Sequence, residues 1–145
     1  MKRIAVVVAV AGVCLVACAP MPTGGGGGIT ASPCNDGVCK VDVDVTSCVI
    51  TPVPDGLVVA GENNIFWELN FSSSFYRFTE DGIKLKTPST SFDGPELQPN
   101  GKKFKLHDKY TAQGKFPYWI KVQRWKVFEG WTDCPLLDPF IQNGS

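Results

Sequence analysis

Six cysteines and a single histidine, His107, are the side chains of this 145-residue chain with the most restrictive chemistry. One imidazole excludes any metal site that needs two histidines from one chain, and with it most zinc enzymes and the usual copper electron carriers. The cysteines can be reactive thiols or structural disulfides, depending on their spacing and environment. We predict neither a metal site nor a bound cofactor.

Four of the cysteines lie in the part of the chain with globular composition: Cys34, Cys39, Cys48 and Cys134. An even number in an exported domain indicates two disulfides, for which three connectivities are possible. The sequence Cys-Asn-Asp-Gly-Val-Cys has a wider spacing than a thioredoxin-type redox motif, and its Asn-Asp-Gly is typical of a turn. This favours a local Cys34–Cys39 bridge, with Cys48 paired to Cys134.

His107 invites a catalytic interpretation because Asp108 follows it, but a nucleophile–base pair needs a spatial adjacency that sequence does not show. By alternation, His107 shares the outward phase of Lys103 and Lys105, which predicts an exposed, unengaged histidine at a strand end. Nothing singles out an acid–base pair among the fourteen carboxylates. We predict no catalytic residue and a protein that is not an enzyme.

Residues 124–131, Arg-Trp-Lys-Val-Phe-Glu-Gly-Trp, place aromatic side chains beside basic ones near a loop. Such residues are typical anchors for a protein or glycan partner. The alternative is that Trp125 and Trp131 fold back onto the domain. The candidate binding residues are Tyr76, Arg77, Trp125, Phe128 and Trp131.

The charge balance argues against one class of partner, and the composition indicates a folded chain. Fourteen basic residues balance fourteen acidic ones, which argues against a nucleic-acid partner. A hydrophobic content of 43% with 19% charged residues is typical of a globular chain, and the length allows one domain.

The first residues have the pattern of an export signal. Lys2 and Arg3 precede an apolar run over residues 4–16. This run is shorter than the roughly 20 residues of a transmembrane helix but suits the core of a signal peptide.

The end of this run, Leu15-Val16-Ala17-Cys18, resembles the lipobox of bacterial lipoproteins. The resemblance implies a diacylglyceryl group on the Cys18 sulfur, cleavage after Ala17 and acylation of the new amino terminus, and two or more acyl chains anchor a protein stably. Ala19, where an inner-membrane sorting signal has Asp, implies the outer membrane. An ordinary secretory peptide or an uncleaved anchor is the alternative.

Cleavage there would remove Cys14 and two basic residues and leave a net charge of −2. The next segment carries no charge and contains five consecutive glycines, Gly24 to Gly28, which indicates a flexible linker. We therefore divide the chain into a signal peptide (1–17), a lipidated cysteine with linker (18–33) and a folded domain (34–145).

The folded domain shows the two-residue period of β-strands. Val41, Val43 and Val45 alternate with polar residues, as do Phe104 and Leu106. Similar patterns cover residues 57–59, 65–71 and 83–85, the last after an Asp81-Gly82 turn signal, and residues 116–122, which continue toward 127 with a phase slip. Short alternating strands between turn residues predict an all-β sandwich.

Residues 41–143 resemble small exported bacterial cupredoxin-like domains, through Ile65-Phe66-Trp67-Glu68-Leu69, Gly114-Lys115-Phe116-Pro117-Tyr118 and Asp138-Pro139-Phe140-Ile141-Gln142-Asn143. The resemblance implies a Greek-key sandwich of cupredoxin-like or immunoglobulin-like architecture. It also implies that no copper is bound, because Ile120 stands where that family has its ligand cysteine.

These observations predict an envelope lipoprotein, anchored to the membrane through Cys18, whose sandwich is a binding or structural module for an unknown protein or glycan. A copper or electron-transfer accessory of cupredoxin ancestry and an inhibitor of a hydrolase are the alternatives.

Overall fold

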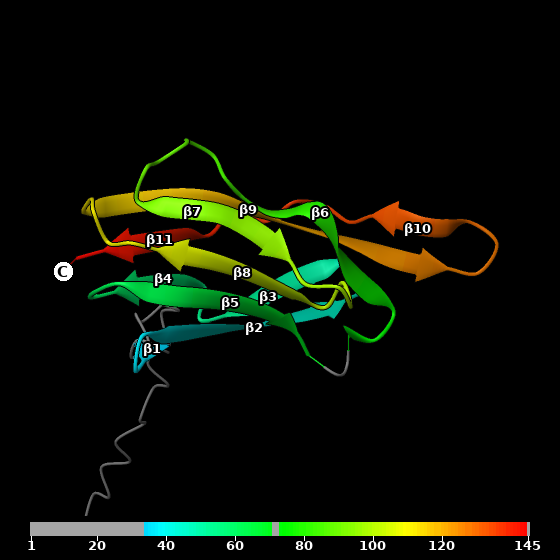
Figure 1. Cartoon of the computed structure of the whole chain (residues 1–145). Coiled ribbons are helices and arrows are strands. Elements are labelled where there is room, and N and C mark those ends of the chain that lie inside the picture. Colours follow the sequence, from blue (N-terminus) through cyan, green and yellow to red (C-terminus); the bar gives the residue numbers. More distant parts are fainter. Residues whose placement is uncertain (1–33, 71–72, 145) are drawn as a thin grey trace, which may run out of the picture.

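The computed structural model describes residues 34–70 and 73–144, which form eleven strands and no α-helix. They are arranged in two sheets that face one another (Figure 1). The first sheet contains β1 (Cys34–Asn35), β2 (Val38–Thr46), β3 (Val49–Val53), β5 (Asn63–Leu69), β7 (Phe92–Leu97) and β8 (Lys103–Asp108). The second contains β4 (Gly56–Val59), β6 (Tyr76–Leu85), β9 (Gly114–Lys126), β10 (Gly130–Asp133) and β11 (Phe140–Asn143). The predicted all-β sandwich is confirmed; its Greek-key, cupredoxin-like and immunoglobulin-like details stay predictions.

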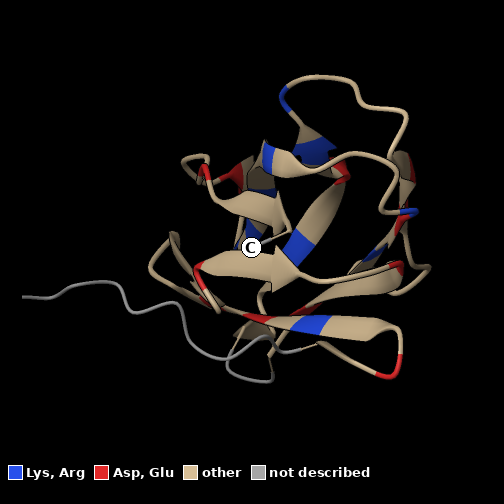
Figure 2. Cartoon of the chain, turned by 90° about the vertical axis from the view of Figure 1, so that its left-hand side faces the viewer, with Lys and Arg blue, Asp and Glu red and all other residues tan. Residues whose placement is uncertain are grey.

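Most neighbouring strands pair antiparallel, but β2 pairs parallel with β5, and β4 pairs parallel with β11. In the first sheet the path is β1-β2-β5-β8-β7, and β3 also pairs with β2. In the second sheet β9 is central: β6 lies on one of its edges, while β11 and β10 share the other. Seen end-on, the strands of the two sheets surround the core, and residues of both charges are scattered along the chain (Figure 2).

Alternation explains the core, because every second residue of the central strands points inward. Val41, Val43 and Val45 of β2 are buried, as are Tyr118 and Ile120 of β9. Three edge-to-face aromatic pairs connect the two sheets. This ring geometry is more favourable than the burial of the same apolar area alone, so the pairs stabilise the packing of one sheet on the other. They are Trp67–Tyr118, Phe78–Phe104 and Phe92–Phe116, with ring centroids 5.2, 5.8 and 5.0 Å apart.

Both predicted disulfides are present. Cys34–Cys39 closes the small β1–β2 loop, and Cys48–Cys134 joins the β2–β3 turn in the first sheet to the end of β10 in the second. The second bridge therefore ties the two sheets together covalently.

Two local expectations differ from the structure. The predicted turn at Asp81-Gly82 is a bulge within β6, because the register jumps between Phe78↔Val122 and Ile83↔Ile120. Glycine is required there, since a Cβ on Gly82 would lie 2.9 Å from both the Phe78 Cβ and the Thr79 carbonyl oxygen. The predicted phase slip in β9 is also absent, because residues 123–126 pair one by one with β10, and Trp125 and Val127 are exposed and do not continue the buried face.

Candidate functional site

The second half of β9 leaves the sandwich and forms a projecting hairpin with β10 (Figure 1). The buried face of β9 ends at Val122, and Arg124 and Trp125 beyond it are exposed. We call residues 123–133 the hairpin and residues 126–129 its tip. Two-stranded ribbons are marginally stable in water, so this hairpin needs support from its side chains.

An aromatic and cationic stack supplies part of that support. Trp125 and Trp131 are directly opposite in the register, with their rings edge-to-face at 5.4 Å. The Arg77 guanidinium carbon lies 4.2 Å from the centre of the Trp131 ring, within cation–π range. Three predicted binding residues from β6, β9 and β10 are thus brought together. Trp125 remains 44% exposed, so the stack is not folded into the core.

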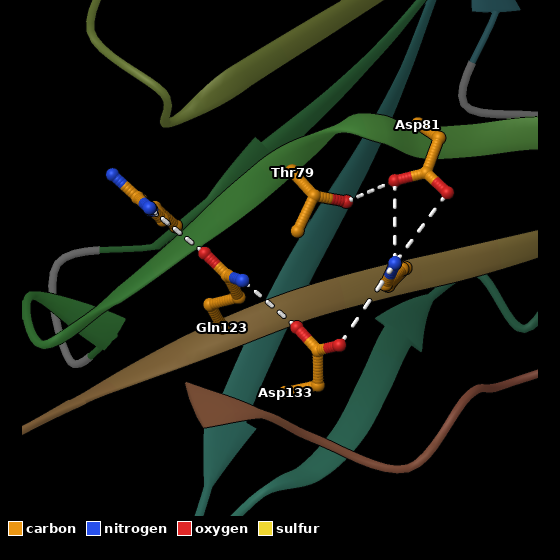
Figure 3. A network of polar contacts seen from close by, with 6 residues as sticks. Thr79, Asp81, Gln123 and Asp133 are labelled. Atoms are coloured by element: carbon orange, nitrogen blue, oxygen red, sulfur yellow. Dashed lines mark hydrogen bonds and ion pairs between the residues drawn. The ribbon is translucent and has the colours of Figure 1, made fainter. Parts of the chain in front are cut away.

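A polar network continues from the stack across the outer face of the second sheet (Figure 3). Arg77 donates through Nε and Nη2 to the Gln123 side-chain oxygen, at 3.1 and 2.9 Å. Gln123 in turn donates to Asp133 Oδ1 at 2.8 Å. This chain of hydrogen bonds holds β10 against β9 and β6.

The other end of the network uses the β6 bulge (Figure 3). Lys121 Nζ lies 3.4 Å from Asp81 Oδ1 and 3.9 Å from Asp133 Oδ2, so one ammonium group serves two carboxylates. The Thr79 hydroxyl donates to Asp81 Oδ1 at 2.7 Å, and this bond, with the Lys121 charge, lowers the pKa of the Asp81 carboxyl. Asp81 is therefore a charged member of a satisfied network and not a proton donor at neutral pH.

An open groove of about 840 Å³ runs along this network, between β6 and the loop that joins β7 to β8. Lys102 lines it, but its ammonium group donates to the backbone oxygens of Ser73, Ser74 and Tyr76. Burial lowers the pKa of Lys102. This lysine fixes the start of β6 and is not a free cation in the groove.

The tip carries the most exposed apolar side chains of the hairpin. Phe128 is fully exposed and Val127 is 69% exposed. Phe128 has a left-handed backbone φ of 78°, which a bulky residue rarely adopts. Lys126 and Glu129 form an ion pair of 2.8 Å across the turn. The turn therefore presents an aromatic ring to solvent at the end of a supported ribbon.

A smaller hollow of about 370 Å³ lies beside the tip, on the other face of the hairpin. Its lining combines apolar side chains with two cations and consists of Phe75, Tyr76, Arg124, Trp125, Lys126 and Val127. Phe75 is 66% exposed, and its carbonyl oxygen accepts a hydrogen bond of 2.8 Å from the Trp125 amide. Phe75 was not among the predicted site residues, although it directly precedes two of them.

The five predicted binding residues do not share one environment. Arg77, Trp125 and Trp131 form the stack, and Phe128 is at the tip. Tyr76 is only 6% exposed, and its hydroxyl accepts a hydrogen bond of 3.2 Å from the Cys48 amide. It joins the root of the hairpin to the bridged β2–β3 turn.

His107 and Asp108 lie on opposite faces of β8. His107 Nε2 is 3.2 Å from Glu62 Oε1 on the outer surface, whereas Asp108 is fully buried. The structure therefore does not bring the two side chains together as a pair. Among the residues that the structure describes, no three His, Cys, Asp or Glu side chains are grouped so that they could hold a metal ion.

The predicted signal peptide, lipidated Cys18 and linker lie outside the described residues. Within residues 34–70 and 73–144, no helix is long and apolar enough to cross a membrane. The sequence of this chain matches neither a protein-family model nor a curated protein.

Proposed function

We propose that this protein is a lipoprotein of the bacterial envelope, anchored through Cys18, whose β-sandwich is a non-enzymatic binding module with the β9–β10 hairpin as its recognition element. The observation that carries this proposal is the fully exposed Phe128 at the end of a ribbon held by the Trp125–Trp131 pair. Together with the exposed Val127 and Trp125 it forms a group of exposed apolar side chains, and such groups are typical of interaction sites.

The support beneath the tip favours recognition over chance exposure. Arg77 touches both Trp131 and Gln123, and Asp133 holds Gln123 from the other strand. A pre-organised loop loses less conformational entropy on binding than a mobile one, so more of its contact energy appears as affinity.

The anchor is tested by the intact mass of protein purified from envelopes. Wild-type protein should begin at Cys18 and carry the mass of its acyl groups, and Cys18→Ser should carry none. Detergent-phase partitioning of Cys18→Ser equal to that of wild type would contradict the lipid anchor.

The recognition element is tested by photo-crosslinking in intact cells, with benzoylphenylalanine at position 128. Val53 is the matched control position, because it is also apolar, 61% exposed and on β3, away from the hairpin. Adducts with envelope components should form from position 128 and not from position 53. Equal adduct yields at the two positions would contradict the proposal.

A further inference from the structure

We infer that the hairpin tip docks on the surface of a lipid bilayer that carries anionic phosphate headgroups, with Phe128 and Val127 entering the acyl region. The inference deepens the proposed function, because it rests on the same hairpin and names what the hairpin binds. Four features carry it: the shape of the tip, its charges, the hollow beside it and the length of the chain before β1.

The shape of the tip is suited to a deformable, fluid surface such as a lipid bilayer. Val127 and Phe128 protrude from a turn, and the neighbouring Trp125 and Phe75 add exposed aromatic area behind them. A convex apolar end needs a hollow in a rigid partner, whereas a bilayer accepts it without one. Tryptophan side chains favour the headgroup level of a membrane, where one edge is apolar and the other is wet. Trp125 lies at that level when Phe128 is inserted.

The charges at the tip complement anionic headgroups. Arg124 is exposed and forms no side-chain hydrogen bond or ion pair with any described residue. Lys126 is paired with Glu129, but an ion pair at this exposure is weak and leaves the lysine able to exchange partners. Residues 124–129 carry two cations and one anion. Basic residues beside an apolar insertion are attracted to phosphate-bearing lipids.

The hollow beside the tip combines both properties. Its lining includes the exposed apolar residues Phe75 and Val127 together with the basic Arg124 and Lys126. An amphiphile with an anionic headgroup matches this combination, because apolar residues can contact its apolar part while the cations contact phosphate. A neutral glycan would leave Arg124 without a charged partner and would give Lys126 none besides Glu129.

The length of the chain before β1 is compatible with docking at the membrane that would hold Cys18. The hairpin lies at the opposite end of the domain from β1 (Figure 1). The 13 residues of β9 span roughly 43 Å at the usual rise of a strand. The residues from Cys18 to Cys34 can span at most roughly 50 Å. The tip and the anchor can therefore reach one surface.

The experiment uses the full-length lipidated protein in vesicles of phosphatidylethanolamine and phosphatidylglycerol with brominated acyl chains. Bromine quenches tryptophan fluorescence at short range, so quenching reports insertion of Trp125. The signal of Trp125 is the difference between wild type and Trp125→Phe. The double variant V127S/F128S should lower this quenching by about threefold, because the apolar insertion is lost.

Two further variants complete the design. R124Q/K126Q should lower the quenching in these vesicles by about twofold at low salt, with a smaller effect at high salt, since screening weakens headgroup attraction. Val53→Ser is the matched control and should leave quenching unchanged, because Val53 is an exposed apolar residue on β3. Lys126 is half-buried and the other variant positions are exposed, and unchanged thermal unfolding verifies that all variants fold.

Equal quenching in wild type and V127S/F128S would overturn the inference. So would protein adducts without lipid adducts from a crosslinker at position 128, which would make a protein the occupant of the tip. If the proposed lipid anchor is wrong, the result is different. The intact mass of the protein would then lack acyl groups, whether or not Trp125 is quenched. An acylated protein with an unquenched Trp125 would contradict membrane docking of the tip and leave the lipid anchor supported.

Discussion

The Asn143 side-chain amide donates a hydrogen bond of 3.1 Å to the Asp108 carboxyl group, and this bond joins β11 of one sheet to β8 of the other. Both side chains are buried. The second carboxyl oxygen of Asp108 and the carbonyl oxygen of Asn143 have no hydrogen-bond partner among the described residues. Burial raises the pKa of Asp108, although hydrogen bonds from the Tyr110 amide and Asn143 oppose the shift. Burial therefore favours the protonated carboxyl group, while the hydrogen bond from Asn143 favours the charged one.

This predicts that Asp108 makes stability depend on pH. A raised folded-state pKa contributes stability that is complete below the unfolded value of about 3.9 and is lost as the pH rises through the folded value. Asp108→Asn keeps the shape, cannot ionise and supplies a donor. We expect it to raise the free energy of unfolding at pH 7 by about 1 kcal/mol. Urea unfolding of both proteins from acid to neutral pH measures the difference, and a difference that does not change with pH would contradict the prediction.

The hydrogen bond across the core gives a second prediction. Trp67 Nε1 donates to the Tyr118 hydroxyl at 2.9 Å, and both side chains are fully buried. Tyr118→Phe leaves the indole N–H without an acceptor, which should lower the free energy of unfolding by about 1–3 kcal/mol. Tyr110→Phe is the matched control, because the Tyr110 hydroxyl bonds no described residue. Equal losses in the two variants, measured by urea unfolding, would argue against the role of this bond.

The two disulfides should differ in their contribution to stability. Cys48–Cys134 closes a sequence separation of 86 residues, whereas Cys34–Cys39 closes one of 5. In the chain-entropy account, C48A/C134A should cost about 4–5 kcal/mol and C34A/C39A about 2 kcal/mol. Thermal and denaturant unfolding of the two double variants ranks them. The reverse ranking would show that native-state packing around the loops dominates over loop length.

The hairpin should be locally destabilised when its stack is removed. Trp131→Ala deletes the contact with Trp125 and the cation–π contact with Arg77, each typically worth about 1 kcal/mol. Hydrogen exchange should quicken in residues 123–133 and stay unchanged in β2 and β5, because the latter lie in the other sheet. Trp119→Ala, a change on the same sheet outside the hairpin, is the control. Unchanged exchange in the hairpin would mean that β10 is held by the polar network alone.

The fold was predictable where alternation was uninterrupted. The two-residue period of β2, β5, β8 and the first part of β9 follows directly from burial on one face. β7 was not predictable in this way, because Gly94 and Pro95 interrupt it and its middle residues are exposed at a sheet edge. The residue types of Asp81-Gly82 favour a change of chain direction. Because the flanking residues pair with β9, the structure accommodates this preference as a β-bulge and not as a turn.

The residues of the candidate site could be recognised from the sequence, but their positions relative to one another could be predicted only in part. Residues 124–131 are recognisable as an aromatic and basic segment, but their projection beyond the sandwich depends on where the core ends. Tyr76 alternates in phase with the buried Phe78, a pattern that could have placed it inward. The role of Gln123 and Asp133 was not predictable, because their register across β9 and β10 is set by tertiary structure.

The position of the first disulfide has a mechanical consequence. Because Cys34 is bonded to Cys39 within β2, a pull on the preceding chain bypasses β1 and enters β2 directly. β2 is flanked by β5 along Val38–Val43 and by β3 along Asp42–Thr46, and the hairpin is at the far end of the domain (Figure 1). For a domain anchored as we propose, tension between the preceding chain and the tip would run along the strands, so the hydrogen bonds that cross them would be loaded together in shear and not opened one at a time. We therefore expect the force that unfolds this domain to depend on the shear resistance of the pairings of β2 with β5 and β3, and not on equilibrium stability alone.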